Sequence, residues 1–131
     1  MLGGALEAFE LTLNYIKERE QFGQKIGSFQ ALQHRAALMF TDLELCKSCV
    51  LEALTAFDEN SNDLQRIVSL AKSKMGETFY NVSNEGVQMH GGVGVTDEYD
   101  IGLYMKRARV AEQTFGNSEH HRNRYAELTG F

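Results

Sequence analysis

Proline is absent from the sequence of 131 residues, although an average composition of about 5% would supply about six. Because proline breaks the interior of a helix, a chain without any can consist mostly of long helices. Long apolar runs are absent as well: none approaches the roughly 20 residues of a membrane span, and no signal-peptide core follows Met1. The sequence therefore predicts neither a membrane span nor a secretory leader.

Basic residues are fewer than acidic ones: the chain has 13 lysines and arginines and 18 aspartates and glutamates, which gives a net charge of -5. This acidic balance disfavours a nucleic-acid backbone as the main partner. Hydrophobic residues make up 43% and charged residues 24% of the chain, which excludes a disordered protein. The length supports one core, so we expect residues 1–131 to form a single domain.

Cysteine is scarce too, and the only two, Cys46 and Cys49, form one Cys-x-x-Cys pair. A structural zinc site needs four ligands, and no second cysteine or histidine pair has a suitable spacing. No Glu-x-x-His pair is present either, which disfavours a di-iron bundle. We therefore predict no metal site, and reduced cysteines that pack inside a cytoplasmic protein.

Apolar residues recur at steps of three and four along most of the chain, which is the pattern of amphipathic helices. No segment alternates with a period of two, so we predict no sheet. The expected fold class is all-α: an antiparallel four-helix up-and-down bundle with a short extra C-terminal helix. The predicted helices cover approximately residues 2–18, 29–57, 64–90, 101–115 and 118–128.

The first predicted helix is already in phase at Leu2, and no capping residue precedes it. Such a start is typical of a helix cut out of a longer one. We therefore expect the chain to be a fragment of a longer polypeptide.

Three segments interrupt the helices with residues that helices do not need. In residues 19–23, Arg19 offers a fork of donors suited to phosphate, and Phe22 offers an aromatic face. The alternative is a solvated loop with Phe22 tucked into the core. The glycine-rich residues 88–94 follow a helix rather than a strand, so they are either a ligand loop or a helix C-cap turn. The basic residues within 106–122 either contact an anion or form a solvated face.

These segments resemble motifs of the acyl-CoA dehydrogenase family. Residues 18–23 read Glu-Arg-Glu-Gln-Phe-Gly and are followed by Ser-Phe-Gln at 28–30, similar to the family's ER-x-x-FG … x-x-Q segment. Residues 86–94 read Gly-Val-Gln-Met-His-Gly-Gly-Val-Gly, similar to A-x-Q-x-x-GG-x-G, and residues 104–109 read Tyr-Met-Lys-Arg-Ala-Arg, similar to x-x-x-RDAR. Over residues 4–128, the chain therefore resembles the family's C-terminal helical domain.

The resemblance implies an oxidoreductase that oxidises an acyl-CoA thioester at its α–β bond and passes a hydride to FAD. It also implies a homo-oligomer, a dimer or tetramer, in which FAD is shared with a neighbouring subunit. Arg19 and Gln21 would contact the diphosphate side of FAD, and the turn at Gly116 would approach the flavin. The residues that the resemblance places at FAD are Arg19, Gln21, Phe22, Ile26, Phe29, Gln88, Gly91, Gly92, Gly116 and Asn117.

One departure concerns catalysis. Many family members carry a catalytic glutamate where this chain has Phe115, and a phenyl ring cannot abstract a proton. Glu112 and Glu119 flank the turn without occupying that position. Other members place the base on the first long helix of this domain, at a position that would precede residue 1. The chain therefore belongs either to an enzyme with a relocated base or to a non-catalytic structural or pairing subunit, and we assign no catalytic residue. In either case we expect residues 19–23, 88–94 and 106–117 to converge on one groove for a dinucleotide that is shared between protomers.

Overall fold

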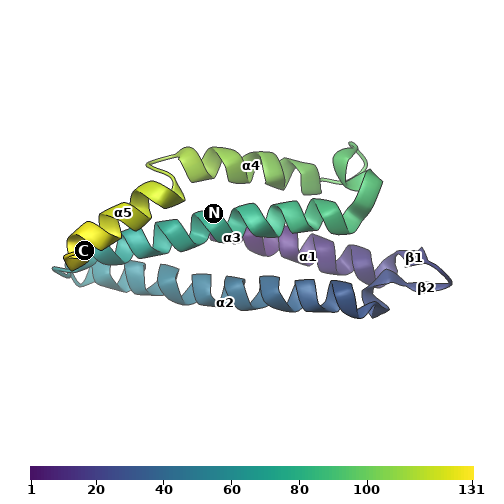
Figure 1. Cartoon of the computed structure of the whole chain (residues 1–131), viewed down its shortest axis with the longest axis horizontal. Coiled ribbons are helices and arrows are strands. Elements are labelled where there is room, and N and C mark those ends of the chain that lie inside the picture. The colour runs from purple at the N-terminus through teal and green to yellow at the C-terminus, as the bar shows by residue number, and fades with distance from the viewer.

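The computed structural model describes all 131 residues and confirms the all-α fold class (Figure 1). Helices α1, α2 and α3 lie alongside one another, whereas α4 and α5 follow each other along α3. Two short 3₁₀ segments, Ile26–Ser28 and Gly91–Val95, precede α2 and follow α3. The α-helices are α1 (Leu2–Glu18), α2 (Gln30–Asp58), α3 (Leu64–His90), α4 (Ile101–Gln113) and α5 (Ser118–Thr129).

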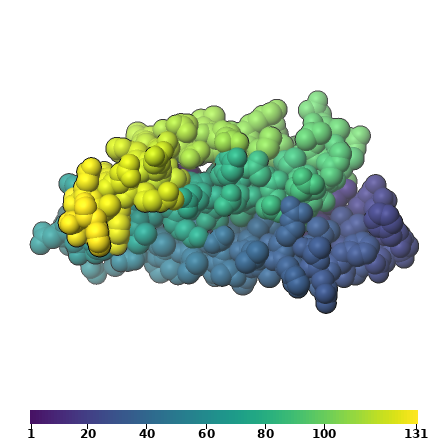
Figure 2. Space-filling view, in the orientation of Figure 1, coloured from purple at the N-terminus to yellow at the C-terminus, as the bar shows by residue number.

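A short β-hairpin, formed by β1 (Glu20–Gln21) and β2 (Gln24–Lys25), was not predicted. Its strands have two residues each, and so short a strand displays no alternating pattern in the sequence. The hairpin protrudes from one end of the bundle, and α5 lies at the other end (Figure 2). The predicted end of the fourth helix, residue 115, was also wrong, because α4 stops at Gln113 and a turn follows.

Helix α3 is the centre of the bundle, because it contacts each of the other four α-helices. The largest side chains that are almost fully buried are Phe79 of α3 and Leu43 of α2. Cys46 is buried in the same core, Cys49 is half-buried, and both are free thiols. The two cysteines therefore pack within the bundle, as predicted.

Glycine in α3 allows its neighbours to come close. A Cβ atom at Gly86 would lie 2.7 Å from Ile101 Cδ1 and 2.8 Å from Thr12 Oγ1. The start of α4 and the middle of α1 therefore both press against α3 at this residue. No helix is long and apolar enough to cross a membrane, and no cluster of three potential metal ligands forms.

Candidate functional site

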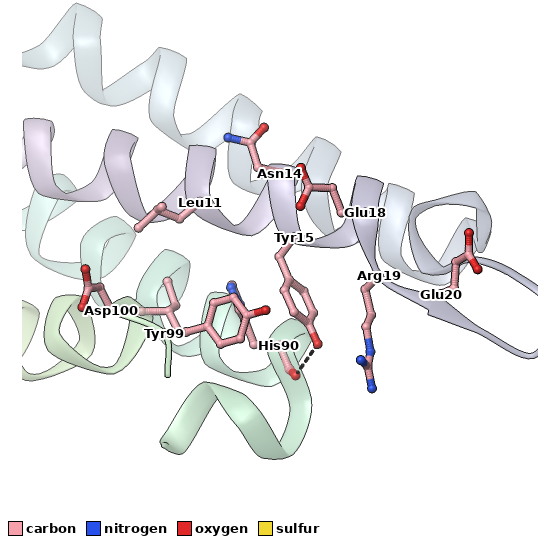
Figure 3. A pocket seen from close by; sticks show the side chains of 10 residues that line it. Leu11, Asn14, Tyr15, Glu18, Arg19, Glu20, His90, Tyr99 and Asp100 are labelled. Atoms are coloured by element: carbon pink, nitrogen blue, oxygen red, sulfur yellow. Dashed lines mark hydrogen bonds between the residues drawn. The ribbon is translucent and has the colours of Figure 1, made fainter. Parts of the chain in front are cut away.

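A pocket of about 460 Å³ opens where the ends of α1 and α3 meet the start of α4 (Figure 3). The pocket brings the first interrupting segment, through Arg19, next to the second, through His90. Its lining residues are Leu11, Asn14, Tyr15, Glu18, Arg19, Glu20, His90, Tyr99, Asp100 and Ile101.

Three aromatic rings form one wall of the pocket. Tyr15 stacks on His90 with ring centroids 4.2 Å apart, and Tyr99 meets both rings edge-on at 5.2 and 5.3 Å. The Tyr15 hydroxyl also donates a hydrogen bond to the His90 carbonyl oxygen, at 3.2 Å (Figure 3). Because these contacts join α1 to the end of α3, they fix the glycine-rich segment relative to Arg19.

His90 is buried, with 4% of its surface exposed. Its Nδ1 lies 2.7 Å from the Gly86 carbonyl oxygen, which can only accept, so Nδ1 carries the proton in this contact. Burial lowers the pKa of His90, and the hydrogen bond to Gly86 opposes that shift. The imidazole is therefore neutral near pH 7 and serves as a packed wall rather than as a cation.

This environment makes stability depend on pH. Because the folded state favours neutral His90, the unfolded chain binds a proton more readily, and stability falls as pH drops below the ordinary pKa of 6.5. When the pH is lowered from about 7.5 to 5.5, we expect the melting temperature of His90→Phe, which keeps an aromatic ring, to fall less than that of wild type. His34→Gln, at an exposed histidine, is the control. Equal losses in wild type and His90→Phe would contradict the assignment.

Arg19 follows the last residue of α1 on an extended backbone, and its side chain lines the pocket, extending from the helix end on the same side as Tyr15 (Figure 3). It forms no ion pair within the chain. The neighbouring Glu20 is engaged elsewhere: its carboxylate lies 2.7 Å from Lys25 Nζ, and Lys25 lowers the pKa of Glu20. The guanidinium is therefore available to an anion.

The hairpin tip holds Phe22 in an unusual conformation. Phe22 and Gly23 form a two-residue loop with φ angles of 56° and 78°, the geometry of a type I′ turn. The first of these positions favours asparagine, aspartate or glycine, so a phenylalanine there is strained. Phe22 is 90% exposed, and its ring meets the Phe29 ring in an edge-to-face arrangement with centroids 6.1 Å apart. The alternative that Phe22 enters the core is therefore wrong.

The remaining predicted residues of the first two segments lie at the same end of the bundle. Gln21 is exposed in β1, and Ile26 and Phe29 are half-buried before α2. Gln88 is exposed in the last turn of α3. Gly91 and Gly92 are also exposed, and a Cβ added at either would meet no atom within 4 Å. A ligand can therefore approach the backbone of these two glycines.

The end of the third segment lies elsewhere, although its first residue, Lys106, lines a pocket together with Gly94 of the second segment. Phe115, Gly116 and Asn117 form the turn between α4 and α5, which is tied to α3 by a 3.0 Å hydrogen bond from Ser73 Oγ to the Ser118 carbonyl oxygen. Between Ser73 and His90, α3 rises about 25 Å. Within one chain the turn and the hairpin therefore lie at separate places, and their convergence on a dinucleotide shared between protomers stays a prediction.

Sequence reasoning missed Tyr15 and Tyr99 as pocket residues. Tyr15 lies off the apolar stripe of the first helix, and a large aromatic residue outside the stripe was the available signal. Tyr99 lies in the turn before α4, where no periodic pattern guides an assignment. Only the fold brings both beside His90.

Comparisons with known proteins agree with this arrangement. The sequence profile described as the acyl-CoA dehydrogenase C-terminal domain matches residues 1–129. The acyl-CoA dehydrogenase IpdE2 of Mycolicibacterium smegmatis is 37% identical over 115 residues, covering 88% of this chain and 35% of that protein. The chain spans about a third of the length of the curated relatives it matches.

Two solved structures superimpose closely on the bundle. A variant of the Tcur3481-Tcur3483 steroid ACAD has a TM-score of 0.93 and 33% identity, over 98% of this chain and 35% of that one. The FAD complex of PigA has a TM-score of 0.92 and 25% identity, over 98% of this chain and 33% of that one. An all-α bundle with these motifs in these places is the arrangement expected of an acyl-CoA dehydrogenase C-terminal helical domain. The chain belongs to the acyl-CoA dehydrogenase family and corresponds to its C-terminal domain.

Proposed function

We propose that this chain supplies FAD contacts and subunit contacts in an FAD-dependent acyl-CoA dehydrogenase, an enzyme that desaturates acyl-CoA thioesters. One observation carries the proposal: the Arg19 guanidinium, which forms no ion pair, and the exposed Phe22 ring lie at the same end of the bundle. A strained aromatic residue that does not pack in the core of its own chain is typical of a residue that contacts another molecule.

The residues present fit FAD. Arg19 matches a diphosphate through charge-assisted hydrogen bonds, and Phe22 offers a face to the adenine side. The open space at Gly91 and Gly92 allows the cofactor to approach the main chain. When bound, FAD accepts the hydride; the part of this chain is to hold and orient it. Gln21 and Gln88 offer amide groups, and Ile26 and Phe29 offer apolar surface, as the family resemblance expects.

Helix α2 supports the proposed contact with a second subunit. Much of its apolar surface is left uncovered: Leu51 is 65%, Leu54 59% and Phe57 66% exposed. Large exposed apolar residues that gather on one helix are typical of an interaction surface. A homo-oligomer, a dimer or tetramer, is the arrangement we propose.

We expect the purified chain to self-associate because of this apolar surface. Gel filtration at rising concentration should give a dimer or larger species. Leu51→Glu combined with Leu54→Glu should shift the elution toward the monomer, because the charges oppose burial. Thr55→Glu, at an exposed polar residue of the same helix, is the matched control. A strict monomer at high concentration would count against a homo-oligomer.

Phe115 favours a second candidate function. The side chain is 91% exposed at the position where the family resemblance places the catalytic glutamate, and it cannot take up a proton. A non-catalytic structural or pairing subunit of the same fold would keep the FAD and subunit contacts and lack the base. The same observation is compatible with an enzyme whose base lies on another part of a longer polypeptide.

The proposed function is tested in the assembly that forms around this chain in its native cells. An affinity-tagged chain should co-purify with bound FAD, visible by its absorbance. Acyl-CoA added without oxygen should then bleach the flavin. An assembly without flavin would refute the proposal, and a flavin that resists every acyl-CoA would favour the pairing subunit.

Phe22 gives a test in which stability and function move in opposite directions. Phe22→Asn should raise the free energy of unfolding by up to about 1 kcal/mol, because asparagine tolerates the left-handed conformation. The same change should reduce FAD retention, because the ring is lost. Phe22→Ala removes the ring without relieving the backbone, so it should reduce FAD retention with no gain in stability. Thermal unfolding measures the change in stability, and flavin content measures FAD retention. Full flavin content in both variants would contradict the assignment of Phe22 as an FAD contact.

A further inference from the structure

The turn between α4 and α5 carries the second strained phenylalanine of the chain. Phe115 has a φ of 61° and Gly116 a φ of 98°, so two consecutive residues adopt positive φ. This conformation is unfavourable for a bulky residue such as Phe115. Since the Phe115 side chain is 91% exposed, packing of its ring does not compensate. The turn must therefore be held by other groups.

Polar contacts hold both flanks of the turn. Lys72 of α3 donates to the carbonyl oxygens of Ala111 and Glu112, at 3.1 and 2.9 Å, and so caps the last turn of α4. On the other side, Asn117 Oδ1 accepts a hydrogen bond from the His120 backbone N–H at 2.9 Å and caps α5. These contacts fix the helix ends, but none reaches the main chain of Phe115.

His121 does reach it. The imidazole Nε2 lies 2.9 Å from the Phe115 carbonyl oxygen, and Nδ1 lies 3.4 Å from Ser69 Oγ. The His121 residue is 5% exposed and Ser69 is fully buried. Because a carbonyl oxygen only accepts, Nε2 must carry a proton, and neutral imidazole then accepts from the Ser69 hydroxyl through Nδ1. A buried chain of hydrogen bonds thus runs from α3 through α5 to residue 115.

We propose that His121 is a positioning residue that fixes the main chain of residue 115 in the turn between α4 and α5. The inference rests on the proposed function, together with the family resemblance by which this turn would approach the flavin. His121 keeps Phe115 in its left-handed conformation and directs the ring out of the bundle. The imidazole acts through the Phe115 carbonyl oxygen.

The first test needs no substitution. Long-range ¹H–¹⁵N spectra of the wild-type chain at about pH 8, where histidine is neutral, report which ring nitrogen is protonated. We expect the Nε2–H tautomer for His121. The Nδ1–H tautomer would overturn the proposal, because Nε2 could then not donate to Phe115.

The second test separates a positioning role from a merely structural one. His121→Gln keeps an N–H donor, whereas His121→Leu keeps bulk without a donor. We expect His121→Leu to move the backbone amide signals of residues 114–117 and to speed exchange of the Gly116 amide about tenfold, and His121→Gln to restore both. Asn123→Leu, at an exposed residue of the same helix, should leave these signals unchanged.

The decisive test is the double variant that combines Phe115→Gly with His121→Leu. Because glycine adopts positive φ freely, Phe115→Gly should return the signals of residues 116 and 117 toward wild type in the His121→Leu background. If His121→Leu fails to fold, His121→Asn, whose shorter side chain does not reach the Phe115 carbonyl, replaces it. Unmoved signals in the donor-less variant, or equal effects of the Gln and Leu variants, would overturn the proposal.

These readouts are independent of flavin. A native assembly without FAD would refute the proposed function while the spectra still report on His121. Conversely, an unperturbed turn in His121→Leu would refute the positioning role even in an assembly that contains FAD.

Discussion

Phe115→Glu is expected to raise the rate of flavin reduction by acyl-CoA by about 10²- to 10⁴-fold, the usual contribution of a positioned base. The turn already holds residue 115 in place through His121, and its side chain is 91% exposed, so a carboxylate would replace the ring without entering the core. The measurement is anaerobic bleaching of FAD in the native assembly. The prediction applies to the pairing-subunit function, in which the wild-type chain contributes no base.

Phe115→Gln is the matched control, since its amide has nearly the same shape as the carboxyl group but does not accept a proton. Glu112→Gln and Glu119→Gln should change nothing, because neither residue occupies the turn position. If the wild-type assembly already reduces FAD rapidly, and the glutamate variant adds nothing, the base lies on another part of the polypeptide. The non-catalytic function would then be rejected.

Arg19→Ala is expected to weaken FAD binding by about 10- to 100-fold, because a hydrogen bond to a charged group contributes about 1.5–3 kcal/mol. The guanidinium forms no ion pair in the chain, so its removal leaves no buried partner behind. The stability of the bundle should therefore remain within about 0.5 kcal/mol of wild type. Flavin retention during dialysis of the assembly measures the effect.

Two variants accompany this prediction. Arg19→Lys keeps the charge but loses the planar fork, so it should retain part of the affinity. Lys17→Ala removes an exposed cation from the same end of α1 and should leave FAD binding unchanged. Equal flavin content in Arg19→Ala and wild type would contradict the assignment of this segment.

The helical framework could be predicted because each long helix repeats its apolar residues at a constant period. The core residues Phe9, Leu43 and Phe79 all came from the predicted helices. The family followed from motifs at 18–30, 86–94 and 104–109, and the profile match over residues 1–129 confirms it. Local patterns were sufficient because this fold is built from a few long helices with short connections.

What the sequence did not reveal depends on tertiary contacts or on single backbone angles. The exposure of Phe22 follows from a positive φ in a two-residue loop, which no periodic pattern encodes. Tyr15 and Tyr99 become neighbours only when α1 and the start of α4 meet at the end of α3. The separation of Phe115 from Arg19 depends on where the connection after α4 docks along α3. Each of these is a matter of three-dimensional packing.

The distance between the hairpin and the α4–α5 turn has a consequence for mixed assemblies. In the proposed homo-oligomer, with about 25 Å of α3 between the two places, one protomer would serve the cofactor of its neighbour with the hairpin and another cofactor with the turn. A single protomer damaged at both places would then impair two centres at once. Co-expression of damaged and intact copies would reduce flavin occupancy more steeply than the fraction of damaged copies.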